Sequence, residues 1–160
     1  MIKDKLVKRT VYLSLIVQLV TTLISLEGLR YDLRPEDMIL KDILVLEAVV
    51  QFVEAGFYIW VIMALDRLEI MTQRRYIDWF ITTPTMLVST VVFMEYLKRK
   101  EKGGSTFTLR EFLVENKGDL IIIASLNFLM LLFGYLGETG VLNNNSAVAI
   151  GSVFFAGSFK

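Results

Sequence analysis

The 160-residue sequence contains no cysteine, no histidine and only two prolines. These absences exclude disulfides, Cys/His zinc sites, histidine-ligated heme and catalytic pairs that depend on histidine. The 17 basic and 17 acidic residues cancel, so the composition gives no sign of a nucleic-acid-binding surface or a polyanionic tail. Most familiar enzyme classes are thereby excluded, and we expect neither an enzyme nor a metal site.

Apolar residues, in contrast, are abundant. They make up 54% of the chain, against about 45–50% in soluble domains, and the mean hydropathy is +0.55. Charged residues gather in short blocks between long apolar runs. Three runs carry no charge, Val11–Leu26, Trp79–Met94 and Leu120–Gly137, and a fourth, Ile43–Leu65, carries only Glu47 and Glu54.

Each run reaches the roughly 20 apolar residues that a helix needs to cross a bilayer, once its flanking residues are included. We therefore predict one all-α membrane helical bundle over residues 1–160, in an integral, multi-pass membrane protein. Its expected helices lie at about 10–27, 39–65, 75–99, 118–137 and 146–160. A single run could instead be the core of a soluble bundle, and the first could be a signal sequence. Four consecutive runs and the lack of a cleavage site argue against both.

The last predicted helix, Ser146–Lys160, is short. Fifteen residues span about 22 Å at 1.5 Å per residue, whereas the hydrocarbon core is about 30 Å thick. A helix that stopped at mid-depth would leave backbone groups in lipid, so we expect the sequence to be part of a longer working protein. The basic residues favour an extracellular N-terminus, with nine of them on the inner side against seven for the opposite orientation.

Polar residues form one stripe on each of the first three helices. The stripes are Ser14, Gln18, Thr21 and Ser25; Glu47, Gln51, Glu54 and Tyr58; and Asp78, Thr82, Thr85 and Ser89. Steps of four, three and four residues keep each set within about 60° around a helix. Hydroxyls and amides also occur as ordinary contacts between helices. A carboxylate at mid-depth costs about 2.5–3.5 kcal/mol, however, and marks a functional site by default.

Residues 75–84, Arg-Tyr-Ile-Asp-Trp-Phe-Ile-Thr-Thr-Pro, resemble the third-helix signature of microbial (type 1) rhodopsins, R-Y-x-D-W-x-x-T-x-P. Residues 130–140 resemble the fourth helix and following turn of proteorhodopsin-like members. The resemblance covers the first five of the family's seven helices. It implies an all-trans retinal cofactor, attached to a lysine on a seventh helix that this sequence does not contain. Lys160 fits that role poorly, because Ala156 stands where the family has an aspartate.

The same resemblance implies roles for individual residues. Asp78 would be the counterion of the protonated Schiff base, with Arg75 and Thr82 near it. The retinal pocket would be lined by Tyr76, Trp79, Thr83, Met86, Met130, Gly134, Gly151, Ser152 and Phe155. The tryptophan that the family carries on its fifth helix falls on Val148. A carboxylate at position 78 is consistent with this role, because a protonated imine in a low dielectric needs a nearby anion.

Proton-pumping members carry a second carboxylate eleven residues after the counterion, where this chain has Ser89. A serine hydroxyl cannot release a proton near neutral pH. Asp78, Thr82 and Ser89 thus resemble the D-T-S combination of some giant-virus rhodopsins. Polar residues of the first three helices predict an ion pathway that comprises Ser14, Gln18, Glu47, Gln51, Glu54 and Ser89.

These features predict a light-gated cation channel in the lipid bilayer that passes monovalent cations or protons. A slow outward proton pump and a photosensory receptor remain as alternatives. For a receptor, Lys98–Lys102 is the available cytoplasmic contact, although this charge run is more simply a positive-inside anchor. The resemblance also implies a homo-oligomer, and no nucleic-acid partner is expected.

Overall fold

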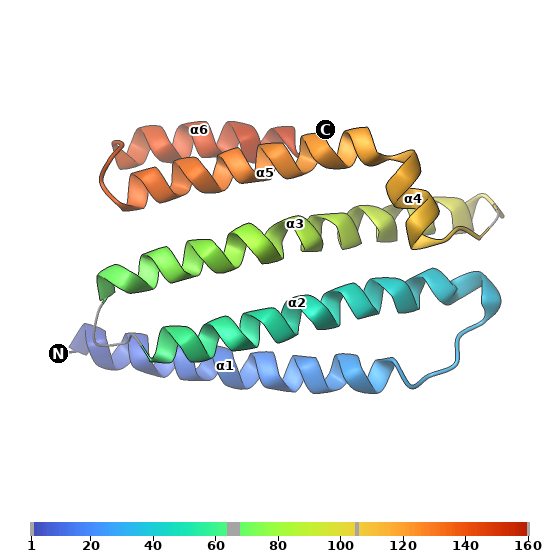
Figure 1. The fold of residues 1–160 in the computed structure, drawn as a ribbon, viewed down its shortest axis with the longest axis horizontal. Helices are drawn as coiled ribbons and strands as arrows, with labels where there is room; N and C mark the ends of the chain where they lie inside the picture. Colours follow the sequence, from blue (N-terminus) through green and yellow to red (C-terminus); the bar gives the residue numbers. More distant parts are fainter. Residues whose placement is uncertain (1, 64–67, 105, 160) are drawn as a thin grey trace.

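A computed structural model describes residues 2–63, 68–104 and 106–159 (Figure 1). The helices are α1 (Ile2–Gly28), α2 (Met38–Ile62), α3 (Leu68–Glu101), α4 (Leu109–Glu115), α5 (Lys117–Glu138) and α6 (Asn144–Gly157). A short 3₁₀ turn, η1 (Pro35–Asp37), precedes α2. No strand occurs among the described residues, and the predicted all-α fold class is confirmed.

The predicted helices correspond to α1, α2, α3, α5 and α6, but several ends differ. α1 begins at Ile2 instead of residue 10, because the charged N-terminal segment contains no proline or glycine to stop it. α3 likewise begins at Leu68, seven residues before the predicted start. The predicted end of the second helix, at residue 65, lies outside the described residues. So does Lys160, with its possible role as the retinal lysine.

Consecutive helices pack side by side, α1 on α2, α2 on α3, α3 on α5 and α5 on α6 (Figure 1). The short α4 turns the chain between α3 and α5. The bundle therefore has two ends. We call the end with the first turns of α1 and α3 the amino end, and the end with the α1–α2 connection the α4 end.

Four segments in the described part of the chain are long and apolar enough to cross a membrane. They are Lys8–Gly28, Pro35–Ile62, Thr72–Glu101 and Lys117–Glu138. Large apolar side chains such as Leu23 and Phe52 are exposed on them. So much exposed apolar surface is unfavourable in water but is solvated by lipid tails in a bilayer. α6 has 14 residues and spans about 21 Å at 1.5 Å per residue.

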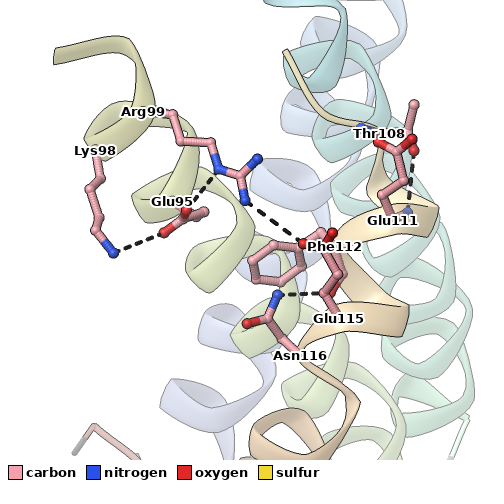
Figure 2. A network of polar contacts seen from close by, with 8 residues as sticks. All are labelled: Glu95, Lys98, Arg99, Thr108, Glu111, Phe112, Glu115 and Asn116. Carbon is pink, nitrogen blue, oxygen red and sulfur yellow. Dashed lines mark hydrogen bonds and ion pairs between the residues drawn. The ribbon is translucent and has the colours of Figure 1, made fainter. Parts of the chain in front are cut away.

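The α4 end holds the main cluster of buried apolar side chains: Ile39, Val92, Tyr96, Phe107, Phe112 and Leu120. α4 begins with a capping box, in which the Thr108 hydroxyl accepts from the Glu111 amide and the Thr108 amide donates to the Glu111 carboxylate (Figure 2). Hydrogen bonding of the Glu111 carboxylate by Thr108, first through the Thr108 backbone amide, holds the pKa of Glu111 below its usual range. The cap fixes where α4 starts against α3.

Arg99 ties the last turns of α3 to the segment that follows. Its Nε donates to Glu95 at 2.8 Å, and its Nη2 lies 3.9 Å from a carboxylate oxygen of Glu115 on α4 (Figure 2). The guanidinium also lies 4.4 Å from the centroid of the Phe107 ring. An ion pair and a cation–π contact on one side chain restrain the α4 end more than either would alone.

α5 and α6 approach each other closely at Gly137. A Cβ atom at this position would lie 2.5 Å from the Cβ of Ala147 on α6, which is closer than two carbons can pack. Small residues at such positions let the backbones of membrane helices approach. The turn between these helices is therefore set by the absence of a side chain at residue 137.

We expect Gly137→Ala to lower the free energy of unfolding by about 1–3 kcal/mol, because the extra methyl forces α6 to shift. Gly118→Ala is the matched control on the same helix, since nothing lies within 4 Å of a Cβ there. Thermal unfolding in detergent, followed by circular dichroism, measures both variants. A Gly137→Ala midpoint as high as that of the control would show that the close approach does not require glycine.

Candidate functional site

Asp78 is a buried carboxylate in the first half of α3. Its residue is 8% exposed, and its Oδ1 atom has no hydrogen-bond partner in the described part of the protein. Thr82, one turn later, donates to the backbone carbonyl of Asp78 at 3.0 Å and not to its side chain. A buried carboxylate oxygen without a partner is costly unless a donor or cation meets it. The side chain thus fits a cationic group placed beside it.

A cavity of about 440 Å³ lies beside Asp78 and between α1, α2 and α3. Ser14 lines it from α1, Tyr58 from α2, and Arg75 and Trp79 from α3. The predicted site residue Ser14 therefore lies on the same cavity as Asp78. The cavity gives the unpaired carboxylate an adjoining space with both polar and aromatic walls.

Arg75 forms its ion pair with Glu138 at the end of α5. Thr72 donates to the same carboxylate at 3.2 Å, and the Arg75 guanidinium lies 5.1 Å from the centroid of the Trp79 ring. Arg75 thus lies near Asp78 while its charge is held by another helix. Glu138 was not among the predicted site residues, although it belongs to the turn that resembles proteorhodopsin-like members.

Tyr76 is the centre of an aromatic wall between α3 and α5. Its ring packs edge-on against Trp79 at 5.2 Å and against Tyr135 at 5.3 Å between centroids. A Cβ at Gly134 would lie 3.0 Å from the Tyr76 hydroxyl, so glycine leaves room for the ring. Tyr76, Gly134 and Val148 also line a cavity of about 490 Å³. Two of the predicted pocket residues, Tyr76 on α3 and Gly134 on α5, therefore meet.

The remaining predicted pocket residues lie less centrally. Gly151 is buried against α5, where a Cβ would be 3.6 Å from the carbonyl of Met130, itself partly buried. Ser152 and Phe155 are exposed on α6, and Met86 is exposed on α3. Their contacts with a chromophore stay a prediction.

Thr83 connects α3 to α5 through a residue that the sequence analysis did not select. Its hydroxyl donates to the Trp79 carbonyl at 2.6 Å and accepts from Asn127 Nδ2 at 2.8 Å. Asn127 is 4% exposed. It is the single amide side chain within the uncharged run Leu120–Gly137. An isolated amide in an apolar run was the sequence feature from which a contact between helices could have been predicted.

The polar stripes of α1 and α2 face each other. Gln18 Nε2 donates to Glu54 Oε2 at 2.6 Å and to the Gln51 carbonyl at 3.2 Å. Ser25 donates to the Gln51 side-chain oxygen at 3.0 Å. Glu47, on the same stripe of α2, contacts the hydroxyl of Ser89 on α3. We call Gln18, Ser25, Glu47, Gln51, Glu54 and Ser89 the polar seam.

The family profile described as "Bacteriorhodopsin-like protein" matches residues 8–159. The chain belongs to this family. Its fold is similar to the crystal structure of the viral rhodopsin OLPVRII, with 28% sequence identity and a TM-score of 0.74 over 96% of this chain and 68% of that chain. No curated protein matches the chain.

The inferred resemblance to microbial rhodopsins, and to viral ones in particular, is confirmed. This bacteriorhodopsin-like protein is therefore a light-driven retinal protein of the membrane, with several spanning helices. Its family generally comprises transport or sensory proteins. Asp78 and the Tyr76 wall lie on the stretch of α3 that carries the family's signature.

We expect Asn127→Leu to lower the free energy of unfolding by roughly 0.6–1.7 kcal/mol, the range measured for hydrogen bonds between membrane helices. The variant removes the amide that donates to Thr83 and leaves an apolar side chain of similar size. Ser125→Ala, an exposed change two residues away on α5, is the control. Denaturation in mixed micelles compares the two, and equal stabilities would show that the Asn127–Thr83 bond contributes nothing net.

Proposed function

We propose that this bacteriorhodopsin-like protein is a light-gated cation channel whose conduction path follows the polar seam. The observation that carries the proposal is the joining of α1, α2 and α3 through Gln18, Glu54, Glu47 and Ser89. Two carboxylates, amides and hydroxyls along one line can replace the hydration of a small cation. The seam continues toward the amino end as the cavity lined by Ser14 and Asp78.

Asp78 serves as the anion at the chromophore in this proposal. Bound retinal supplies a protonated Schiff base and a change of shape on absorbing light. Asp78 would hold that positive charge through its unpaired Oδ1, while Thr82 donates to the Asp78 backbone carbonyl from one turn away. Trp79 and Tyr76 provide flat, rigid walls for a polyene. Arg75, paired with Glu138, places a positive charge on the extracellular side if the N-terminus is outside.

Ser89 favours a channel over an efficient pump. It occupies the position of the internal proton donor in pumping relatives, and a hydroxyl cannot take that part. A slow outward proton pump is the second candidate, because the hydrogen bonds from Gln18 to Glu54 and from Ser89 to Glu47 close the seam to hydrated ions at rest. Protons need no open pore to pass along such contacts.

We expect Asp78→Asn to shift the absorption maximum of the retinal-loaded protein to longer wavelength. Loss of the anion removes the charge that stabilises the ground state of the protonated imine. Asp119→Asn, an exposed change at the start of α5, is the matched control and should leave the spectrum in place. An unaltered spectrum in Asp78→Asn would identify another residue as the counterion.

We expect light to evoke a current that reverses its sign with the driving force. The current of a pump would keep its direction near zero gradient, and a sensor would give no current.

Glu54→Gln should reduce cation conductance several-fold, since it removes a negative charge from the seam while its amide oxygen can still accept from Gln18. Glu101→Gln, an exposed change at the end of α3, is the control. Voltage-clamp recordings measure the currents of the unmodified protein, Glu54→Gln and Glu101→Gln. Identical current–voltage curves for Glu54→Gln and the unmodified protein would contradict conduction past Glu54.

A further inference from the structure

The polar seam stops short of the α4 end of the bundle. Its contact nearest that end, between α2 and α3, joins Glu47 to Ser89. Beyond this contact the same face of α3 carries Val92, Tyr96 and Lys100, at steps of three, four and four residues. The face therefore continues from the seam first through an apolar residue and then through two polar ones.

Val92 and two isoleucines of α2, Ile39 and Ile43, form what we call the apolar plug. Val92 is 0% exposed, Ile39 is 4% exposed, and Ile43 packs against the cluster that holds both. From Ser89 to Tyr96 the distance along α3 is seven residues, or about 10 Å at 1.5 Å per residue. A packed apolar constriction excludes water and ions until its walls separate.

Asp37 joins η1 to α3 on the far side of the apolar plug. Its Oδ1 accepts from the Tyr96 hydroxyl at 2.5 Å and from Lys100 Nζ at 2.8 Å. Lys100 also donates to the Tyr96 oxygen at 2.6 Å and lies 5.1 Å from the centroid of the Tyr96 ring. All three residues line a cavity of about 190 Å³. The path from the seam to this cavity is therefore blocked by the plug.

Asp37 also occupies the N-cap position of α2, yet its side chain makes no capping hydrogen bond. An N-cap aspartate ordinarily accepts from a backbone amide two or three residues later and so stabilises the start of its helix. In this structure the carboxylate accepts from α3 instead. Asp37 thus has two alternative sets of donors, one that joins η1 to α3 and one within α2.

The two sides of this contact are held unequally. The last turns of α3 are fixed to the following segment by Arg99, through Glu115 on α4 and the ring of Phe107. Among the described residues, Asp37 makes the only hydrogen bonds that join η1 to α3. Loss of those bonds therefore releases η1 and the first turn of α2, while α3 stays in place.

We propose that Asp37, Tyr96 and Lys100 form a latch that keeps the apolar plug closed at the α4 end of the conduction path. When Asp37 leaves α3, its carboxylate caps α2, and Ile39 moves away from Val92. Water then enters the plug and connects the seam to the cavity beside Asp37. The part that the latch plays in conduction rests on the proposed channel function, and the latch itself does not.

Distances between two spin labels test the latch without any current. Because the chain has no cysteine, Glu36→Cys on η1 and Lys102→Cys after α3, both exposed, can carry the labels. In the retinal-loaded protein in lipid nanodiscs, electron–electron resonance should give one distance in the dark and an added longer one under illumination. Tyr96→Phe removes the hydroxyl but keeps the ring, and should raise the dark population of the longer distance several-fold. Tyr31→Phe, at an exposed tyrosine of the same end, is the matched control.

Hydrogen exchange tests the alternative donors of Asp37. The amides of Ile39 and Leu40 are the two that an N-cap side chain at residue 37 can reach. Their exchange should slow under illumination, because the released carboxylate accepts from them. Faster exchange at both amides would contradict the proposed change of donors.

Photocurrents test the part of the latch in conduction. Tyr96→Phe should slow the closing of the current after light several-fold. Val92→Thr keeps the shape of the side chain but places a hydroxyl in the plug, and should raise the dark current. Val49→Thr, at an exposed valine of α2, is its matched control.

Two distance results would overturn the latch: a single distance that light does not change, or a dark distribution in Tyr96→Phe equal to that of the unmodified protein. If light evokes a reversing current that is the same in Tyr96→Phe, Val92→Thr and the unmodified protein, the latch does not gate conduction. If the distances change as expected while no reversing current occurs, the channel function fails and the latch stands.

Discussion

The arrangement of α1, α2 and α3 depends on one constraint, the need of intramembrane polar side chains to find partners on another helix. Lipid offers them no hydrogen bonds. Gln18 therefore meets Glu54, Ser25 meets Gln51, and Glu47 meets Ser89. These contacts orient the three helices about their axes, while the apolar faces that remain are left to the lipid. The line of polar groups is thus a condition of the packing.

Asp78 departs from this constraint, and the departure makes it the candidate site. Every seam residue has a partner, whereas Asp78 Oδ1 is buried without one. The carboxylate is already placed next to a cavity and one turn before Thr82, so a cationic group can be received without moving α3. Arg75, which lines the same cavity, is instead paired with Glu138. The Asp78 carboxyl is thereby left without a partner beside the cavity.

The polar stripes and the family could be predicted from the sequence because both depend on residues close together in the chain. The spacing of Glu47, Gln51 and Glu54 defines one face of a helix, and the signature at residues 75–84 identifies the family. Contacts between helices are different, because they depend on rotation and register that no single stretch encodes. Glu138 and Asn127 were missed for that reason: their partners Arg75 and Thr83 lie more than forty residues away along the chain.

The helix ends were also hard to place, since propensity alone does not stop a charged helix. α1 and α3 both extend beyond the apolar runs that predicted them. The roles of Ser152 and Phe155 came from the resemblance and depend on which way α6 faces. Sequence reasoning is therefore strongest for a stripe within one element and weakest where two elements must be set against each other.

The restraint of α3 at one end has a mechanical consequence. Arg99 and the cluster around Tyr96 secure α3 near its last turns, while its first turns are held by the half-exposed pair of Arg75 and Glu138. If α3 tilted as a rigid body about these last turns, the pivot would lie near Tyr96. Ser89 lies about 10 Å from that pivot and Asp78 about 27 Å, at 1.5 Å per residue. The same rotation of a rigid α3 would therefore displace Asp78 more than twice as far as Ser89.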